Sequence, residues 1–128
     1  MLCEQRQCKT WLVNLLWLTS GQTDSIIPSK GSEHYYKTIM ALDPNVQDYY
    51  RLFLAPGVNH CLGGPGAYPD TTFDALRKWV ETSEAPETLA ATSVYTTPVI
   101  KRLLCPYPKK QYYNGTREAN SGEGFYCE

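Results

Sequence analysis

The sequence has almost no excess of either charge. Its 128 residues include 12 basic and 13 acidic side chains, which give a formal net charge of −1. Such a chain has no long-range field that attracts a polyanion, so we expect no nucleic-acid partner. Hydrophobic residues make up 42% and charged residues 20%. These values exclude a disordered chain and suit one small globular domain.

Long hydrophobic runs are also missing. The apolar stretch at residues 11–18 (WLVNLLWL) is far shorter than the roughly 20 apolar residues that cross a bilayer, so we expect no membrane span. Its length suits a signal peptide, but Asn14 interrupts it and no small-residue cleavage site follows cleanly. A buried strand of a parallel sheet gives the same continuous pattern, and we favour the strand.

The cysteines lack the spacing of a metal site. Cys3 and Cys8 are too far apart for a zinc knuckle, and no second ligand pair follows, so we predict no metal ligands in this chain. Five cysteines is an odd number. In an oxidising compartment one of them either stays free or has a partner outside this chain. Asn114-Gly115-Thr116 is a glycosylation acceptor if the chain is secreted.

A helix is predicted after the first strand. Residues 34–42 (HYYKTIMAL) place apolar side chains on one helical face, and Ser29 and Ser32 are candidate caps. Asp43-Pro44-Asn45 ends the helix because proline cannot continue it. The face consists of Tyr35, Tyr36, Ile39, Met40 and Leu42.

A second strand and a second helix follow. Tyr49–Ala55 is rich in aromatic and aliphatic residues and predicts a buried strand, and Gly57–Gly66 predicts a glycine-rich loop. Asp70-Thr71-Thr72 caps a helix that runs to about Thr82. After Glu84 no long periodic stretch remains, and we expect an irregular tail. The second helix is expected to bury Phe73, Leu76, Trp79 and Val80.

Asp24 follows the first strand and His60 follows the second. Two strands joined by a helix form a parallel crossover, and the loops after such strands meet at one edge of the sheet. Nucleophile, acid, histidine is the chain order of the triad in α/β-hydrolases. The alternative is a turn aspartate and a surface histidine. His34 lies near a helix start, where a packed or solvated role is commoner.

A nucleophile is missing from this pattern. No serine of the chain stands in a G-x-S-x-G turn, and only 23 residues precede Asp24. We therefore expect a fragment that is inactive alone. A rearranged nucleophile, Ser20 or Ser25, is the less favoured alternative, because neither lies on such a turn.

Around these residues the sequence resembles the tannase and feruloyl esterase family. The resemblance covers roughly Gly21 to Cys127 and is most specific from Tyr50 to Gly66. One departure is Thr19-Ser20-Gly21, where the family usually has a histidine-glycine step. The matching segments are GQTDSIIP at 21–28, YRLFLAPGVNHC at 50–61, GGPG at 63–66, LCPYP at 104–108 and FYC at 125–127.

The resemblance implies a partial α/β-hydrolase fold, consisting of the last strands and helices of a parallel sheet and an irregular, disulfide-closed C-terminal tail. Residues 11–128 would be the C-terminal part of the catalytic domain, preceded by a non-matching segment at 1–10. It also implies a secreted serine esterase acting on aromatic esters of the feruloyl or tannin type. No cofactor is expected in this chain, since the family's calcium site would lie in a lid domain outside it.

The resemblance also assigns roles to single residues. His60 would be the general base and then the general acid, and Asp24 would orient it. Cys61 would pair with a cysteine beside the missing serine. Cys105 and Cys127 would pair with each other, the alternative being two buried free thiols.

A function of another class stays open. Ten tyrosines and three tryptophans are also compatible with a non-catalytic, secreted binding module for phenolic or carbohydrate ligands.

Overall fold

The computed structural model describes residues 16–61 and 63–128. The segment 1–10 with Cys3 and Cys8, and residues 11–15 of the expected first strand, lie outside the described residues. Where the strand is described, it runs from Leu16 to Gly21 and is labelled β1, three residues beyond the predicted end.

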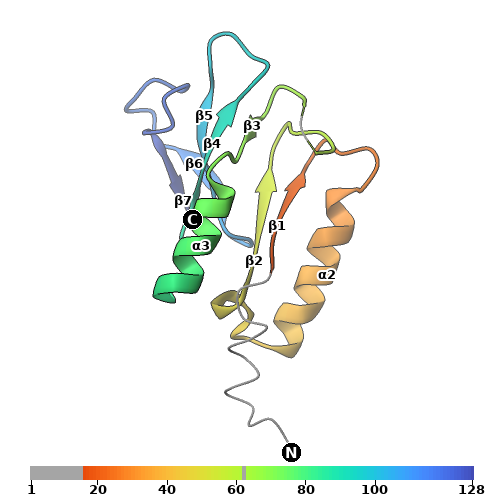
Figure 1. Ribbon diagram of the computed structural model, residues 1–128. Coiled ribbons are helices and arrows are strands. Elements are labelled where there is room, and N and C mark those ends of the chain that lie inside the picture. Colours follow the sequence, from red (N-terminus) through yellow and green to blue (C-terminus); the bar gives the residue numbers. More distant parts are fainter. Residues whose placement is uncertain (1–15, 62) are drawn as a thin grey trace, which may run out of the picture.

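The crossover predicted from the sequence is present. Strand β1 pairs in parallel with β2 (Tyr50–Ala55), in a register from Leu16↔Tyr50 to Gly21↔Ala55. The connection runs through helix α2 (Ser29–Leu42) and a short 3-10 helix, η1 (Val46–Asp48). Figure 1 shows the arrowheads of β1 and β2 side by side, so the loops that follow both strands leave the same edge of the sheet.

Helix α2 packs on β2 mainly through one aromatic side chain. Tyr36 is fully buried, its hydroxyl donates to the Tyr50 carbonyl oxygen at 2.8 Å, and the two rings meet edge to face. The expected serine caps were wrong, because Pro28 occupies the cap position and no side chain caps the first turn. Two residues of the predicted buried face are exposed instead, Tyr35 at 59% and Leu42 at 81%.

Helix α3 has the predicted extent, Thr72–Thr82. Its buried face is narrower than expected, because Trp79 is buried while Phe73 and Val80 are exposed. The Arg51 guanidinium lies 5.9 Å from the centre of the Trp79 ring and donates to the Pro86 carbonyl oxygen, so it contacts the buried side of the helix. Among the described helices, none is long and apolar enough to cross a membrane.

The prediction of an irregular tail was wrong. Strands β3 (Ala67–Tyr68), β4 (Leu89–Ser93) and β5 (Lys101–Leu104) form an antiparallel sheet. Strands β6 (Gln111–Tyr113) and β7 (Phe125–Cys127) form an antiparallel ribbon. The sheets outside the crossover are therefore antiparallel. Strands this short span too few residues to show a period of two in the sequence.

Strand β2 contributes side chains to both hydrophobic cores of the molecule. Side chains alternate between the faces of a strand. Phe53 and Ala55 pack with the β4–β5 sheet, while Tyr50 and Leu52 pack beneath α2. The core on the first side consists of Phe53, Ala55, Val58, Ala67, Leu89, Ala91 and Leu104, and on the second side of Tyr36, Val46, Tyr50 and Leu52.

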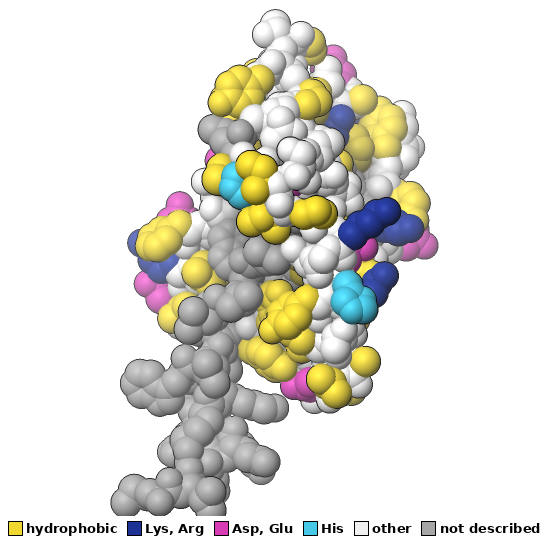
Figure 2. All heavy atoms as spheres, turned by 90° about the vertical axis from the view of Figure 1, so that its right-hand side faces the viewer, with side chains coloured by type: hydrophobic (Ala, Val, Ile, Leu, Met, Phe, Trp, Pro, Cys, Tyr) yellow, Lys and Arg dark blue, Asp and Glu magenta, His cyan; other side chains and the backbone are white. Residues whose placement is uncertain are grey.

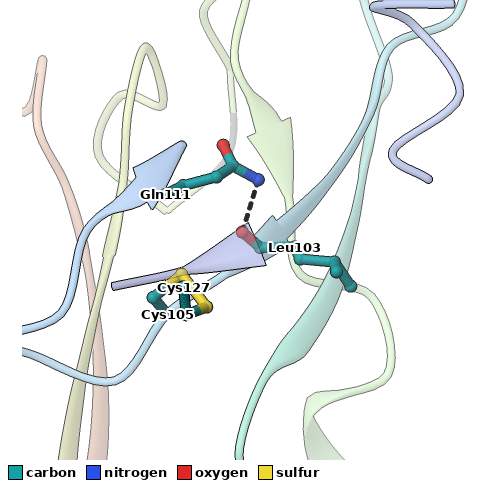
Figure 3. Close-up of a disulfide and its surroundings, with 4 residues drawn as sticks. All are labelled: Leu103, Cys105, Gln111 and Cys127. Atoms are coloured by element: carbon teal, nitrogen blue, oxygen red, sulfur yellow. Dashed lines mark hydrogen bonds between the residues drawn. A yellow bond between two sulfur atoms is a disulfide. The ribbon is translucent and has the colours of Figure 1, made fainter. Parts of the chain in front are cut away.

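The predicted disulfide between Cys105 and Cys127 is confirmed. It joins the end of β5 to β7 across 22 positions, and Figure 3 shows it beside the Gln111 side chain, which donates to the Leu103 carbonyl oxygen at 2.6 Å. The Tyr107 N–H donates to the Leu52 carbonyl oxygen at 2.7 Å. The disulfide thus fastens β7 to the end of β5, and the segment between β5 and β6 is hydrogen-bonded to β2.

Candidate active site

The acid loop begins where β1 ends. Its first turn is closed by a hydrogen bond from the Asp24 N–H to the Gly21 carbonyl oxygen at 3.2 Å. Oδ1 of Asp24 then accepts the N–H groups of Ile26 at 2.8 Å and Ile27 at 2.9 Å. Aspartate commonly makes this turn, because its short side chain reaches the backbone two and three residues ahead. The carboxylate is therefore fixed by its own loop, and Oδ2 is free to face elsewhere.

The histidine loop begins with a tight turn after β2. The Val58 N–H donates to the Ala55 carbonyl oxygen at 3.4 Å, and Gly57 adopts a φ of 72°, a conformation that glycine reaches without steric cost. The Gly66 N–H donates to the Gly57 carbonyl oxygen at 2.8 Å. That bond closes the base of the loop that holds His60.

The two loops bring the predicted acid and histidine together. Oδ2 of Asp24 lies 3.0 Å from Nδ1 of His60. The Asp24 side chain is only 10% exposed, whereas the His60 side chain is 36% exposed. The carboxylate is thus shielded, while part of the imidazole is open to an incoming group.

The environment favours the ionised form of Asp24. The N–H of Ile27 holds the pKa of this carboxyl below its ordinary value, and the N–H of Ile26 and the neighbouring His60 add to the effect against an opposing contribution from burial. An ionised carboxylate only accepts hydrogen bonds. Nδ1 of His60 therefore carries the proton in this pair, and Nε2 is left as the basic nitrogen.

The other candidate residues lie apart from this pair. His34 is exposed on α2, where its carbonyl oxygen accepts the Thr38 hydroxyl. Ser25 is exposed next to the acid. For Ser20 only the backbone in β1 is described. On the face that Figure 2 shows, one histidine side chain reaches the surface among hydrophobic side chains, and the other lies beside Lys or Arg side chains.

Cys61 is a free, exposed thiol directly after the histidine and has a φ of 59°. It borders a hollow of about 210 Å³ beside Asp24. The hollow is lined by Gly21, Asp24, Ala55, Val58, Asn59, Cys61, Tyr68 and Pro69.

Asn114 lies exposed after β6, far from the pair along the chain. Its Oδ1 accepts both the N–H and the hydroxyl of Thr116. Within residues 16–61 and 63–128, no group of three or more His, Cys, Asp and Glu side chains is arranged to hold a metal ion.

One contact of the site was not found from the sequence. The Thr23 hydroxyl donates to Oδ1 of Asn59 at 2.8 Å. These residues immediately precede Asp24 and His60, and both pairs are separated by 36 positions. The sequence held no specific signal for this contact, because any two residues that directly precede Asp24 and His60 have the same separation.

Comparison with known proteins identifies the family. A family model described as tannase and feruloyl esterase matches residues 14–128. The chain belongs to the tannase and feruloyl esterase family.

Similar proteins include several named ester hydrolases. A "Probable feruloyl esterase" from Arthroderma benhamiae is 43% identical over 115 residues, which cover 84% of this chain and 21% of that protein. A mono(2-hydroxyethyl) terephthalate hydrolase from Piscinibacter sakaiensis is 35% identical over 114 residues, covering 86% of this chain and 19% of that protein.

The fold is shared with solved esterase structures. The crystal structure of feruloyl esterase B from Aspergillus oryzae superposes with a TM-score of 0.76 at 26% identity, covering 88% of this chain and 26% of that one. The chain therefore spans about a fifth to a quarter of the length of the relatives it matches.

Proposed function

We propose that this chain carries the acid and the histidine of a serine carboxylic ester hydrolase, on the last part of an α/β-hydrolase fold. The proposal depends on one observation, the 3.0 Å contact between Oδ2 of Asp24 and Nδ1 of His60 at the common edge of β1 and β2. Membership of a family of named esterases supports it.

In the proposed reaction His60 moves protons and Asp24 holds it in place. A serine hydroxyl gives its proton to Nε2 while its oxygen attacks the ester carbonyl carbon. Nε2 then gives that proton to the departing alcohol, which leaves an acyl-serine. Water repeats the exchange and releases the acid and the free serine. The ionised Asp24 stabilises the imidazolium that forms in each step.

The serine is proposed to lie in the protein outside these 128 residues. Two features support this placement: the sequence has no G-x-S-x-G turn, and Cys61 beside the histidine is a free, exposed thiol. In the pattern that the family implies, Cys61 pairs with a cysteine next to the serine, which holds nucleophile and base at a fixed distance. The chain alone is then inactive.

The proposed substrates are esters of aromatic acids. Two relatives, a probable feruloyl esterase and a mono(2-hydroxyethyl) terephthalate hydrolase, are named after substrates that contain an aromatic acyl group. We assign no cofactor to these residues and propose that the family's calcium site lies in a lid domain outside them.

A chimera tests the proposal. Residues 14–128 replace the matching segment of the Arthroderma benhamiae relative, and hydrolysis of methyl ferulate is measured. We expect turnover that falls by a factor on the order of 10⁴ or more in His60→Ala, because removal of the base disables the whole triad.

The chain offers a matched control in its other histidine, His34, which is exposed on α2. The chimera with His34→Ala is expected to keep its activity. Equal activity of the His60→Ala chimera and the unchanged chimera would refute the role of His60. Turnover by the 128-residue chain alone, lost on Ser25→Ala or Ser20→Ala, would refute the placement of the serine.

A second candidate function is a non-catalytic module for phenolic or carbohydrate ligands. It is favoured by the ribbon β6–β7, where Tyr112 and Tyr126 are each about half exposed and their ring centres lie 5.9 Å apart. Saturable binding of ferulic acid or a xylo-oligosaccharide to the 128-residue chain, lost in Tyr112→Ala, would support it. An inactive chimera would then make it the leading candidate.

We also propose secretion with glycosylation at Asn114. The exposed position of this side chain and its hydrogen bond with the Thr116 hydroxyl support the assignment. Secretion from yeast should give a product whose mass falls on enzymatic deglycosylation, while Asn114→Gln gives no shift.

A further inference from the structure

The strand register does not by itself place the acid opposite the histidine. Strands β1 and β2 end with Gly21 paired to Ala55, whereas the paired side chains beyond them are Thr23 with Asn59 and Asp24 with His60. The histidine loop therefore contains two residues more than the acid loop. The turn at Gly57 accommodates these two extra residues. Beyond this turn, the alignment between the two loops differs from the alignment of the strands.

Hydrogen bonds of Thr23 fix this new alignment. Its N–H donates to the Val58 carbonyl oxygen at 3.2 Å, and its hydroxyl donates to Oδ1 of Asn59 at 2.8 Å. Both donors of one residue thus cross to the neighbouring loop, immediately before the acid. Since threonine is branched at Cβ, its side chain has few rotamers, and the hydroxyl keeps its direction.

Asn59 connects Thr23 to the rest of the histidine loop. Its N–H donates to the Gly63 carbonyl oxygen at 2.9 Å, and its side chain lies over Gly64, where an added Cβ would come within 3.1 Å of Oδ1. The asparagine is therefore held by the glycine loop on one side and by Thr23 on the other.

We propose that Thr23 and Asn59 are positioning residues for the acid–histidine pair. Their side-chain hydrogen bond fixes the acid loop against the histidine loop and so sets the distance and angle between Oδ2 of Asp24 and Nδ1 of His60. The inference rests on the proposed function for its catalytic consequence, but the positioning itself is a property of the described loops.

The exposure of Thr23 and Asn59 distinguishes a positioning role from a purely stabilising one. Both side chains are exposed, so water replaces the lost hydrogen bond when either side chain is truncated, and the fold loses little. A small change in the angle of a general base, in contrast, lowers the rate strongly. The expected signature is a loss in kcat with little change in KM or in stability.

The first measurement uses the 128-residue chain and needs no catalysis. In the proton NMR spectrum of histidine-labelled chain, we expect the Nδ1–H signal of His60 to lie at low field and to exchange slowly with water. Thr23→Val, which removes the hydroxyl but keeps the shape, should broaden this signal and move it upfield, and Thr23→Ser should restore it. The control is Thr38→Val, which removes an exposed threonine hydroxyl bond on α2.

The second measurement uses the active chimera. We expect Thr23→Val and Asn59→Ala each to lower kcat about tenfold, which corresponds to about 1.4 kcal/mol in the barrier. The double variant should lose no more than either single one, because both remove the same bond. Thr23→Ser should recover most of the rate.

The two measurements fail in different ways. An unchanged His60 signal in Thr23→Val overturns the positioning role, whether or not the chimera is active. An inactive parent chimera overturns the proposed function, and the NMR comparison then still decides the positioning role. If the chain does not fold alone, both spectra are recorded on the chimera. A rise in KM with kcat unchanged also overturns the proposal, since it indicates a substrate contact.

Discussion

At the scale of single residues, Asp24 divides its two oxygens between two tasks. Oδ1 accepts the N–H groups of Ile26 and Ile27, and Oδ2 faces His60. The bonds that shape the loop also lower the pKa of the carboxyl. The hydrogen bonds of the turn therefore also help Asp24 to orient His60, because they keep its carboxylate ionised.

This arrangement predicts how stability depends on pH. The pKa of Asp24 is lowered in the fold from 3.8, so its stabilising contribution is complete above pH 3.8 and is lost as the pH falls below it. The measurement is urea unfolding of the 128-residue chain from about pH 2.5 to about pH 7, a range that includes this pKa. As the pH falls, the free energy of unfolding should decrease more steeply in the parent than in Asp24→Asn. Asp70→Asn, which alters an exposed aspartate, should follow the parent. Parallel curves for Asp24→Asn and the parent would contradict the assignment.

The glycines of the histidine loop are required by close contacts. Gly64 has a φ of 82°, and a Cβ there would lie 2.3 Å from the Gly57 carbonyl oxygen. We expect Gly64→Ala to destabilise the chain by roughly 1–3 kcal/mol, because the side chain meets backbone in a strained conformation.

Gly31 is the matched control for this substitution. It lies within α2, and a Cβ there meets nothing within 4 Å. Gly31→Ala should stabilise the chain by about 0.5–1 kcal/mol, since alanine loses less backbone entropy in a helix. The free energies of unfolding of the two variants should therefore change in opposite directions, and equal changes would contradict the described loop.

At the scale of elements, two buried tyrosines join α2 to β2 in unequal ways. The Tyr36 hydroxyl donates to the Tyr50 carbonyl oxygen, and burial raises the pKa of Tyr36 to about 12. The Tyr50 hydroxyl is buried without a hydrogen-bond partner among the described residues. One hydroxyl thus contributes a bond between the elements, and the other is buried at a cost.

Removal of each hydroxyl should therefore have a different effect. Tyr36→Phe is expected to lower the free energy of unfolding by about 1 kcal/mol, while Tyr50→Phe should leave it unchanged or raise it slightly. Urea unfolding of both variants at neutral pH measures the difference. A larger loss in Tyr50→Phe than in Tyr36→Phe would show that this hydroxyl is bonded.

At the scale of the whole molecule, the C-terminal half is held by one covalent link and one shared strand. The disulfide Cys105–Cys127 closes the ribbon β6–β7 onto β5, and β2 contributes side chains to both cores. Short antiparallel pairs have little stability alone. The link therefore supplies order that the ribbon itself lacks.

Loss of this link should be costly. For a loop of 22 residues, restriction of the unfolded chain predicts a loss of roughly 3 kcal/mol in Cys105→Ser/Cys127→Ser. The measurement is thermal unfolding of the oxidised parent and of the double variant. Cys61→Ser, which changes only an exposed free thiol in this chain, should unfold like the parent. If Cys61→Ser is destabilised as much as the double variant, the stabilising role of the disulfide is wrong.

The sequence alone determined the crossover, both helices and the acid–histidine pair. It did so because short continuous apolar runs and helical periods are local signals, and because Asp24 and His60 each follow a predicted strand. It did not determine the caps of α2, the exposure of Phe73 and Val80, or the strands after Glu84. These depend on neighbours that are distant along the chain, such as Arg51 against Trp79 and Cys105 against Cys127.

Only the tertiary structure decided how the two loops meet. The two-residue difference between them follows from the strand register, which ends with Gly21 opposite Ala55. The turn at Gly57 and the bond between Thr23 and Asn59 accommodate this difference. The physical reason is that local sequence fixes backbone preference, residue by residue. The 3.0 Å distance between Oδ2 of Asp24 and Nδ1 of His60, in contrast, is set by contacts across the sheet edge.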